Sequence, residues 1–412
     1  MKRRDLLKNT TTLAATAATA GILWSPQARA SAHDTYYAKL NELLKKDGPG
    51  RPVMLIDIER MHHNIDVLAA STGPDKTYRV VVKSLPSVPL LQAVMRRAKT
   101  NSLMVFHQPF LNEVARSFPT SDALLGKPMP AQAARTFYRK LGTTPYDAAG
   151  KVQWLIDSQE RLLQYQHLAR ELGVKMRVNV EIDVGLRRGG LAQPEALATM
   201  LNTVKQDPEH LEFSGLMGYE PHLTGMQAAL EHPAVQSVLQ IYRGHLDVAK
   251  AAGADPQKLT LNGAGSHTLR IYERDNTMND LAAGSGVVMP TDFDTHHLSD
   301  NFPALFIATP ILKRYDRNPV MADPPVDMQR LFYIYGGYWK AKMASPAKVG
   351  EPVYRSTNQS PITTSADVDL RVDDYMFLRP TQSEHVMLQF GDLLAVKDGE
   401  FVERWPVFHQ TG

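Results

Sequence analysis

The sequence of 412 residues contains no cysteine, and this absence excludes several classes of site at once. Without thiols there are no disulfides, no thiolate zinc sites, no iron–sulfur clusters and no cysteine nucleophile. The lack of free thiols also suits a chain that ends in an oxidising compartment. Excess charge is missing as well. Because the formal net charge is only +3 and no long basic run follows the first residues, we expect no nucleic-acid binding.

Long hydrophobic runs are absent after residues 1–30, and those thirty residues have the parts of an export signal. Arg3 and Arg4 precede a hydrophobic pair, a weakly apolar stretch follows over 10–24, and Ala28-Arg29-Ala30 has the small-x-small pattern of a cleavage site. The segment resembles a twin-arginine signal peptide. We therefore expect cleavage after Ala30, a periplasmic or secreted location, and no membrane anchor after processing.

From about residue 52 onward, short β-rich runs alternate with amphipathic helical stretches. The eight predicted strands cover residues 53–57, 78–83, 102–106, 123–125, 152–156, 176–183, 213–219 and 258–261. Such alternation indicates a parallel sheet covered by helices, and eight strands are the number that closes a (β/α)8 barrel. An open, doubly wound sheet is the alternative that the pattern leaves open.

After about Ala308 the prolines become frequent and the helical periodicity fades. Alternating runs predict further strands at 331–335, 367–372, 386–390 and 393–396. We therefore predict an α/β fold that consists of a (β/α)8 barrel and a smaller β domain. An N-terminal segment over 31–50 precedes a barrel over 51–308, and a smaller, mostly antiparallel β domain follows over 309–412.

Lys83 is the first of the candidate functional residues, which all fall where predicted barrel strands end. Reactive groups of a β/α barrel gather at that face. Lys83 ends a run of three valines that we expect to be buried. Burial lowers the pKa of an ammonium group, and the neutral amine forms a Schiff base with an aldehyde. A lysine that reaches solvent from the strand end is the alternative.

A second group follows the strand over 176–183, which ends with Glu181 and Asp183. Arg187 and Arg188 come next and are flanked by glycines, which let the backbone approach a ligand closely. An arginine offers planar donors to a phenolate or a phosphate. A surface turn with solvated arginines explains the pattern equally well.

A third group, Tyr219, Glu220 and His222, follows the next predicted strand. Tyrosine can stack on an aromatic cofactor, and histidine can act as an acid, a base or a ligand. An ordinary loop histidine is the alternative.

The fourth group follows the last predicted barrel strand and precedes a short helix. Small residues at such a position expose backbone N–H groups, which bind phosphate well. An ordinary turn is the alternative. The residues are Gly263, Ala264, Gly265 and Ser266.

The order and spacing of these motifs resemble those of the fold-type III pyridoxal phosphate enzymes. Over most of residues 50–290 the chain is similar to the family of D-threonine aldolase and eukaryotic-type D-serine dehydratase, whose N-terminal half is an alanine-racemase-like barrel. The motifs that carry the resemblance are Asp57 with Asn64-Ile65, Arg79-x-x-x-Lys83-Ser84, Asp157-Ser158, Glu181-x-Asp183-x-Gly185-x-x-Arg188-x-Gly190, Gly215-x-x-x-Tyr219-x-x-His222 and Gly263-x-Gly265-Ser266.

The resemblance implies a role for each of these residues. Lys83 carries pyridoxal 5'-phosphate covalently, Arg188 lies beside its ring, Tyr219 and His222 line the active site, and Gly263–Ser266 hold the phosphate. Lys83 and His222 are then the catalytic residues, with Lys83 as the general base on one face. The implied activity is a lyase reaction at Cα of a D-amino acid or a β-hydroxy amino acid. Because related enzymes often complete the site with a partner's β domain, we expect a homodimer.

The sequence departs from the family pattern in the C-terminal region. The family binds a divalent metal there through a histidine and a nearby cysteine or aspartate. Here Glu384-His385 and Gly391-Asp392 are followed by neither histidine nor cysteine at the expected spacing, so we expect no metal ligands.

Without a metal, two other functions stay open. The first is a metal-independent racemase, for which the second acid could be Tyr333, Tyr335, Tyr338, Tyr354 or Tyr375. The second is a protein that binds pyridoxal phosphate or another ligand without turnover.

Overall fold

A computed structural model describes residues 32–347, 349 and 352–409. The predicted signal peptide over 1–30 lies outside these residues. Within the described part of the chain, no helix combines the length and the apolar character needed to cross a membrane.

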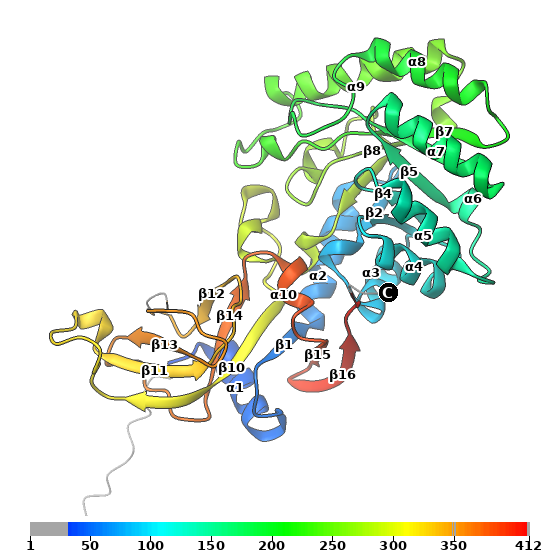
Figure 1. The fold of residues 1–412 in the computed structure, drawn as a ribbon. Coiled ribbons are helices and arrows are strands. Elements are labelled where there is room, and N and C mark those ends of the chain that lie inside the picture. The colour runs from blue at the N-terminus through cyan, green and yellow to red at the C-terminus, as the bar shows by residue number, and fades with distance from the viewer. Residues whose placement is uncertain (1–31, 348, 350–351, 410–412) are drawn as a thin grey trace, which may run out of the picture. The chain divides into compact units, whose positions relative to one another are not determined.

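Eight parallel strands form a closed barrel (Figure 1), as the strand–helix alternation predicts. Each strand pairs with the next along the chain, and the last pairs with the first to close the barrel. The strands are β2 (Thr77–Val81), β3 (Ser102–Val105), β4 (Asp122–Leu125), β5 (Val152–Ile156), β6 (Met176–Glu181), β7 (Leu211–Met217), β8 (Thr260–Gly263) and β9 (Asp280–Ala283). The closed barrel is confirmed over the open sheet.

Of the helices within residues 58–251, one, α2, precedes the first barrel strand, and the others lie between barrel strands along the chain. They are α2 (Ile58–Thr72), α3 (Val88–Ala98), α4 (Gln108–Ser117), α5 (Ala131–Leu141), α6 (Ala148–Lys151), α7 (Gln159–Leu172), α8 (Pro194–Lys205) and α9 (Pro233–Ala251). Helix α7 starts where the sequence predicts, because the Ser158 hydroxyl accepts a hydrogen bond from the backbone N–H of Arg161. It buries Leu162 and Tyr165 on one face and ends at Gly173, which has left-handed backbone angles.

A second sheet contains the remaining strands, in the order β12-β14-β10-β1-β15-β16; off this path β11 pairs with β10, and β13 pairs with β11. Its strand pairs are antiparallel apart from β1 with β15, which confirms the mostly antiparallel character. The strands are β1 (Val53–Asp57), β10 (Leu305–Tyr315), β11 (Arg330–Tyr335), β12 (Ala341–Ser345), β13 (Gln359–Thr364), β14 (Tyr375–Pro380), β15 (Asp392–Lys397) and β16 (Glu400–Pro406). Helix α1 (Thr35–Asp47) packs on this sheet, because Leu40 and Leu44 share an apolar cluster with Phe306 and Phe377.

The prediction that Val53–Asp57 is a barrel strand is wrong. This segment is β1, which lies between β10 and β15, and Asp280–Ala283 takes its place in the barrel as β9. All five residues of β1 are buried, and a run buried on both faces looks alike in a barrel and in the centre of another sheet. The predicted barrel domain over 51–308 thus includes a strand of the second sheet. The domain limits at 51, 308 and 309 stay predictions.

Two strand predictions in the C-terminal region are also wrong. Residues 367–372 contain no strand, and the run over 386–390 overlaps a short helix, α10 (Ser383–Met387).

The interior of the barrel contains a buried polar network near the N-terminal ends of the strands. Arg79 is only 2% exposed, and its guanidinium donates to the Asp280 carboxylate from Nε and Nη2, each at 2.8 Å. Arg79 also pairs with Asp122 at 2.8 Å, and Asp122 accepts a hydrogen bond of 2.9 Å from Gln153. The arginine of the Arg-x-x-x-Lys motif therefore holds strands together.

Candidate active site

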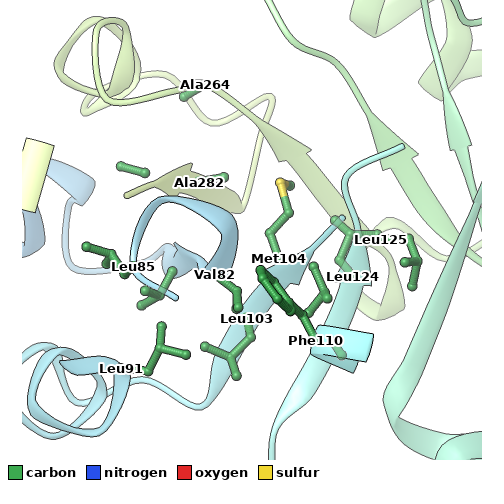
Figure 2. Packing of buried hydrophobic residues seen from close by; sticks show 14 of the residues in the cluster. Val82, Leu85, Leu91, Leu103, Met104, Phe110, Leu124, Leu125, Ala264 and Ala282 are labelled. Carbon is green, nitrogen blue, oxygen red and sulfur yellow. The ribbon is translucent and has the colours of Figure 1, made fainter. Parts of the chain in front are cut away.

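Lys83 lies in a short 3-10 turn, η1 (Val82–Ser84), which directly follows β2. Val82 and Leu85 are fully buried, and Figure 2 shows them among apolar residues that include Leu103. The turn is therefore fixed by packing on both sides of Lys83. Because β1 is outside the barrel, Lys83 follows the first barrel strand rather than the second.

The amine of Lys83 forms an ion pair with the carboxylate of Glu384. Its Nζ also lies 5.1 Å from the centroid of the Phe106 ring. The side chain of Lys83 is 39% exposed, which fits the alternative of a strand-end lysine that reaches solvent. Of the three valines before it, Val81 is half-buried and the other two are buried. The amine is held by a carboxylate and an aromatic ring instead of by burial.

Helix α10 brings Glu384 to this place. The Ser383 hydroxyl donates to the backbone carbonyl of Ser84 at 2.9 Å, and the Ser84 hydroxyl donates to Glu384 Oε1 at 3.3 Å. Val386 and Met387 are buried in the main core, so α10 is anchored from its other side. Sequence reasoning assigned no role to Glu384, although the Glu-His landmark of the resemblance marks its position.

The turn Gly263–Ser266 directly follows β8 and packs on Tyr219. A Cβ atom placed on Gly265 would lie 2.9 Å from Tyr219 Cε2, which is closer than real Cβ atoms come. The Ser266 hydroxyl accepts hydrogen bonds from the backbone N–H groups of Gly284, at 3.2 Å, and Gly286, at 3.0 Å. The turn is therefore tied to the segment that follows β9.

The segment Gly284–Gly286 also contacts the Lys83 turn. The Ser285 hydroxyl donates to the Ser84 hydroxyl at 3.0 Å, and a Cβ atom on Gly284 would lie 2.8 Å from the Cβ of Val81. The lysine turn and the predicted phosphate turn thus meet through one shared segment. Sequence reasoning missed Gly284–Gly286, although its two glycines beside a serine repeat the composition of the turn at 263–266.

Arg188 and Tyr219, two of the predicted site residues, lie close together, and their roles toward the cofactor stay predictions. The central guanidinium carbon of Arg188 lies 4.9 Å from the centroid of the Tyr219 ring. Burial raises the pKa of the Tyr219 hydroxyl, Glu220 and Glu384 act in the same direction, and Arg188 opposes them. Tyr219 therefore lies close enough to Glu384, the ion-pair partner of Lys83, for the Glu384 charge to affect the pKa of Tyr219.

His222 lies beside the glycine-rich turn after β6. Its Nε2 is 3.4 Å from the place of a Cβ atom on Gly185, and its Nδ1 is buried without a hydrogen-bond partner among the described residues. The nearby Glu181 has a pKa raised by burial, which Arg188 opposes. The catalytic role of His222 stays a prediction.

The described residues contain no group of three or more histidine, aspartate or glutamate side chains that could hold a metal ion. Asp294 pairs with Arg379, and Asp292 accepts a hydrogen bond of 2.8 Å from Gln382. The expected lack of a metal stays a prediction.

A family model described as the alanine racemase N-terminal domain matches residues 56–290, which is more than half of the chain. A curated relative, 3-hydroxy-D-aspartate aldolase of Paracoccus denitrificans (strain Pd 1222), is 21% identical over 266 residues. That match covers 61% of this chain and 65% of the relative, so the chain matches just under two thirds of the relative's length.

Several solved structures share the fold. The D-threonine aldolase of Filomicrobium marinum has a TM-score of 0.69 at 14% identity, over 88% of this chain and 98% of the other. D-threo-3-hydroxyaspartate dehydratase from Delftia sp. HT23 has a TM-score of 0.67 at 17% identity, over 87% and 97%. The alanine racemase of Bacillus anthracis has a TM-score of 0.65 at 15% identity, over 86% and 97%. At these identities the structures show a shared fold, and the domain match shows the relationship. The chain belongs to the alanine racemase N-terminal domain family, the barrel family of the fold-type III pyridoxal phosphate proteins.

Proposed function

We propose that the protein is a pyridoxal phosphate enzyme that acts at Cα of a small D-amino acid or β-hydroxy amino acid as a lyase. The observation that carries this proposal is the arrangement around Lys83. Its amine lies at the C-terminal end of a barrel strand, is held by Glu384, and belongs to a turn that is bonded to the segment beside Gly263–Ser266. Family membership implies pyridoxal phosphate as the cofactor.

The residues present fit this cofactor. An aldehyde needs an accessible amine, which Lys83 supplies at 39% exposure. A phosphate needs backbone N–H groups that it can approach, and in the turn Gly263–Ser266 two glycines flank Ala264, whose φ of 66° is the left-handed conformation found in anion-binding turns. Lys83 would hold the aldehyde, Gly263–Ser266 the phosphate, and Tyr219 with Arg188 the ring. When bound, the cofactor supplies an electron sink for a bond broken at Cα of the substrate.

The side chains of this site have distinct tasks in the proposed reaction. Lys83 Nζ would take or return the proton at Cα, because the amine that holds the aldehyde is set free next to the substrate when the substrate replaces it. The Glu384 carboxylate orients Nζ and balances its charge while the amine is free. The Tyr219 ring packs beside Gly265, and the Arg188 guanidinium supplies a positive charge over that ring. His222 is the second candidate for moving a proton.

The names of the similar proteins support a lyase on β-hydroxy D-amino acids. The curated relative is an aldolase of 3-hydroxy-D-aspartate, and solved structures with this fold include a D-threonine aldolase. A metal-independent racemase is the second candidate. It is favoured by the sequence after Gly391-Asp392, which lacks the histidine and cysteine of the family's metal site.

A panel of amino acids tests the proposal. The purified protein is incubated with D- and L-forms of threonine, serine, 3-hydroxyaspartate and alanine, with and without manganese, and the products are separated on a chiral column. Glycine plus an aldehyde indicates an aldolase, a keto acid plus ammonia a dehydratase, and the antipode a racemase. Lys83→Ala abolishes each of these reactions, whereas Lys250→Ala, on the exposed face of α9, leaves them unchanged. If none of these amino acids is converted, the lyase and racemase functions are both contradicted, and binding without turnover is the function that remains.

The location and the assembly belong to the same proposal. Export to the periplasm or outside is supported by the signal-like residues 1–30, and cell fractionation with N-terminal sequencing tests it.

A homodimer is supported by the exposed apolar side chains of the second sheet region, among them Tyr335, Tyr338 and Tyr354. Light scattering measures the mass in solution, and a monomer would refute the dimer.

A further inference from the structure

The proposed function does not use Glu220, a carboxyl group that lies beneath the Gly263–Ser266 turn. Glu220 is 1% exposed. The Thr268 hydroxyl donates a hydrogen bond of 2.7 Å to Glu220 Oε1, and the backbone N–H of Gly265 donates one of 3.0 Å to the Thr268 hydroxyl. The backbone of Ala264 also bonds the Glu220 carboxyl. Three groups thus connect the carboxyl to the turn.

The direction of this hydrogen-bond chain depends on Glu220. A hydroxyl has a single proton, and Thr268 donates it to the Glu220 carboxyl. The lone pairs of the Thr268 oxygen can then accept the hydrogen bond from the backbone N–H of Gly265. Without an acceptor at position 220, no hydrogen bond would fix the orientation of the Thr268 hydroxyl. Gly265 lies close to the Tyr219 ring, since a Cβ atom built on it would come within 2.9 Å of Tyr219 Cε2, and this neighbour limits its movement.

Glu220 is a buried acid among phenols. Burial raises the pKa of Tyr219 on the same segment, of Tyr242 on α9 and of Tyr272 on the short helix η4 (Leu269–Tyr272), and the charge of Glu220 adds to each rise. Burial raises the pKa of Glu220 itself to about 7, and the hydrogen bond from Thr268 opposes that rise. The carboxyl offers an acceptor oxygen to Thr268 in either protonation state.

We propose that Glu220 and Thr268 are positioning residues for a phosphate-binding turn at Gly263–Ser266, in which the Glu220 carboxyl accepts from Thr268 and Thr268 in turn accepts from the backbone of Gly265. The inference rests on the proposed function, because it assigns the phosphate to this turn. It concerns binding alone, so it is measured without turnover.

The test compares pyridoxal phosphate with pyridoxal, which lacks the phosphate. Dissociation constants are measured by absorbance on the full chain after bound cofactor is removed with hydroxylamine. Thr268→Val weakens pyridoxal phosphate at least about tenfold and pyridoxal less than about twofold, since only the phosphate contact depends on the turn. Thr268→Ser keeps the hydroxyl and restores the affinity. Thr136→Val removes a surface hydroxyl on α5 and changes neither constant.

Two substitutions of Glu220 supply a second readout. Glu220→Gln still accepts from Thr268 and keeps the affinity for pyridoxal phosphate, whereas Glu220→Leu removes the acceptor and weakens it at least about tenfold, with pyridoxal changed less than about twofold. Thermal unfolding confirms that each variant is folded. If the wild type binds pyridoxal phosphate but Thr268→Val and Glu220→Leu match Thr136→Val, the inference is overturned and the proposed function stands. If the wild type binds neither compound, both fail.

Discussion

The Lys83 amine and the Glu384 carboxylate form an ion pair although 301 positions separate them in the chain. One belongs to the turn after β2 and the other to α10. The pair brings the C-terminal region to the residue on which the proposed chemistry depends.

Replacement of Glu384 by glutamine removes the charge that holds Lys83 Nζ. We expect kcat/KM to fall at least about tenfold, because a misplaced reacting group costs this much or more. The free energy of unfolding changes by less than about 1 kcal/mol, since Lys83 is 39% exposed in this pair. Steady-state kinetics and urea unfolding measure the two effects.

Glu171→Gln is the control for this substitution, because it removes an exposed carboxylate from a pair with Arg135. Glu384→Asp keeps the charge on a shorter side chain and recovers part of the activity. Full activity in Glu384→Gln would contradict the role of the pair.

Gly265→Ala tests whether the turn after β8 tolerates a side chain. The new Cβ would lie 2.9 Å from Tyr219 Cε2, so either the ring or the turn must move. We expect the affinity for pyridoxal phosphate to fall at least about tenfold in an absorbance titration. Gly244→Ala, in helix α9, is the control. Its new Cβ would lie 3.6 Å from the Pro194 side chain, which is an ordinary contact, so we expect normal affinity. Equal affinities in the two variants would argue against a close fit at this turn.

The buried Glu220 also predicts a pH dependence of stability. Its pKa is about 7 in the folded protein against an ordinary value of 4.5, so the folded state binds more protons between these values. Stability therefore falls as the pH rises from 4.5 to 7 and levels off above, by about 3 kcal/mol from this group. Urea unfolding at pH 5 to 8 should show this slope in the wild type relative to Glu220→Gln. Parallel curves would contradict the assignment.

The network around Arg79 predicts a large loss of stability in Asp280→Ala. The substitution removes the partner of two guanidinium donors at 2.8 Å and leaves a buried charge only partly compensated. We expect unfolding to become easier by about 3–5 kcal/mol. Asp66→Ala, which breaks an exposed pair with Arg97, costs less than about 1 kcal/mol. A loss in Asp280→Ala as small as in the control would show that the network is not essential.

The sequence predicts the barrel because strand–helix alternation is a local signal, and it fails where two locations share the same local pattern. Val53–Asp57 is apolar and buried on both faces, which suits the barrel and the second sheet alike. Asp280–Ala283 was missed because aspartate and alanine are rare in strands, and only its pairing with β2 and β8 makes it one.

The site was predictable where residues follow one another at strand ends. Lys83, Tyr219 and the turn at 263–266 could be found in this way. The structure joins the two turns through Gly284–Gly286 and places Tyr219 against Gly265. The position of Glu384 could not, because it depends on a contact between distant parts of the chain. The apolar residues after it, Val386 and Met387, suggested a strand although they anchor a helix.

The central claim is that Lys83 holds the cofactor, and peptide mapping after borohydride reduction tests it most directly. The full chain is incubated with pyridoxal phosphate, reduced, digested and analysed by mass spectrometry. The account predicts a yellow protein with the reduced label on the peptide that contains Lys83, and no such label in Lys83→Ala. A colourless protein, or a label confined to other lysines, would contradict it.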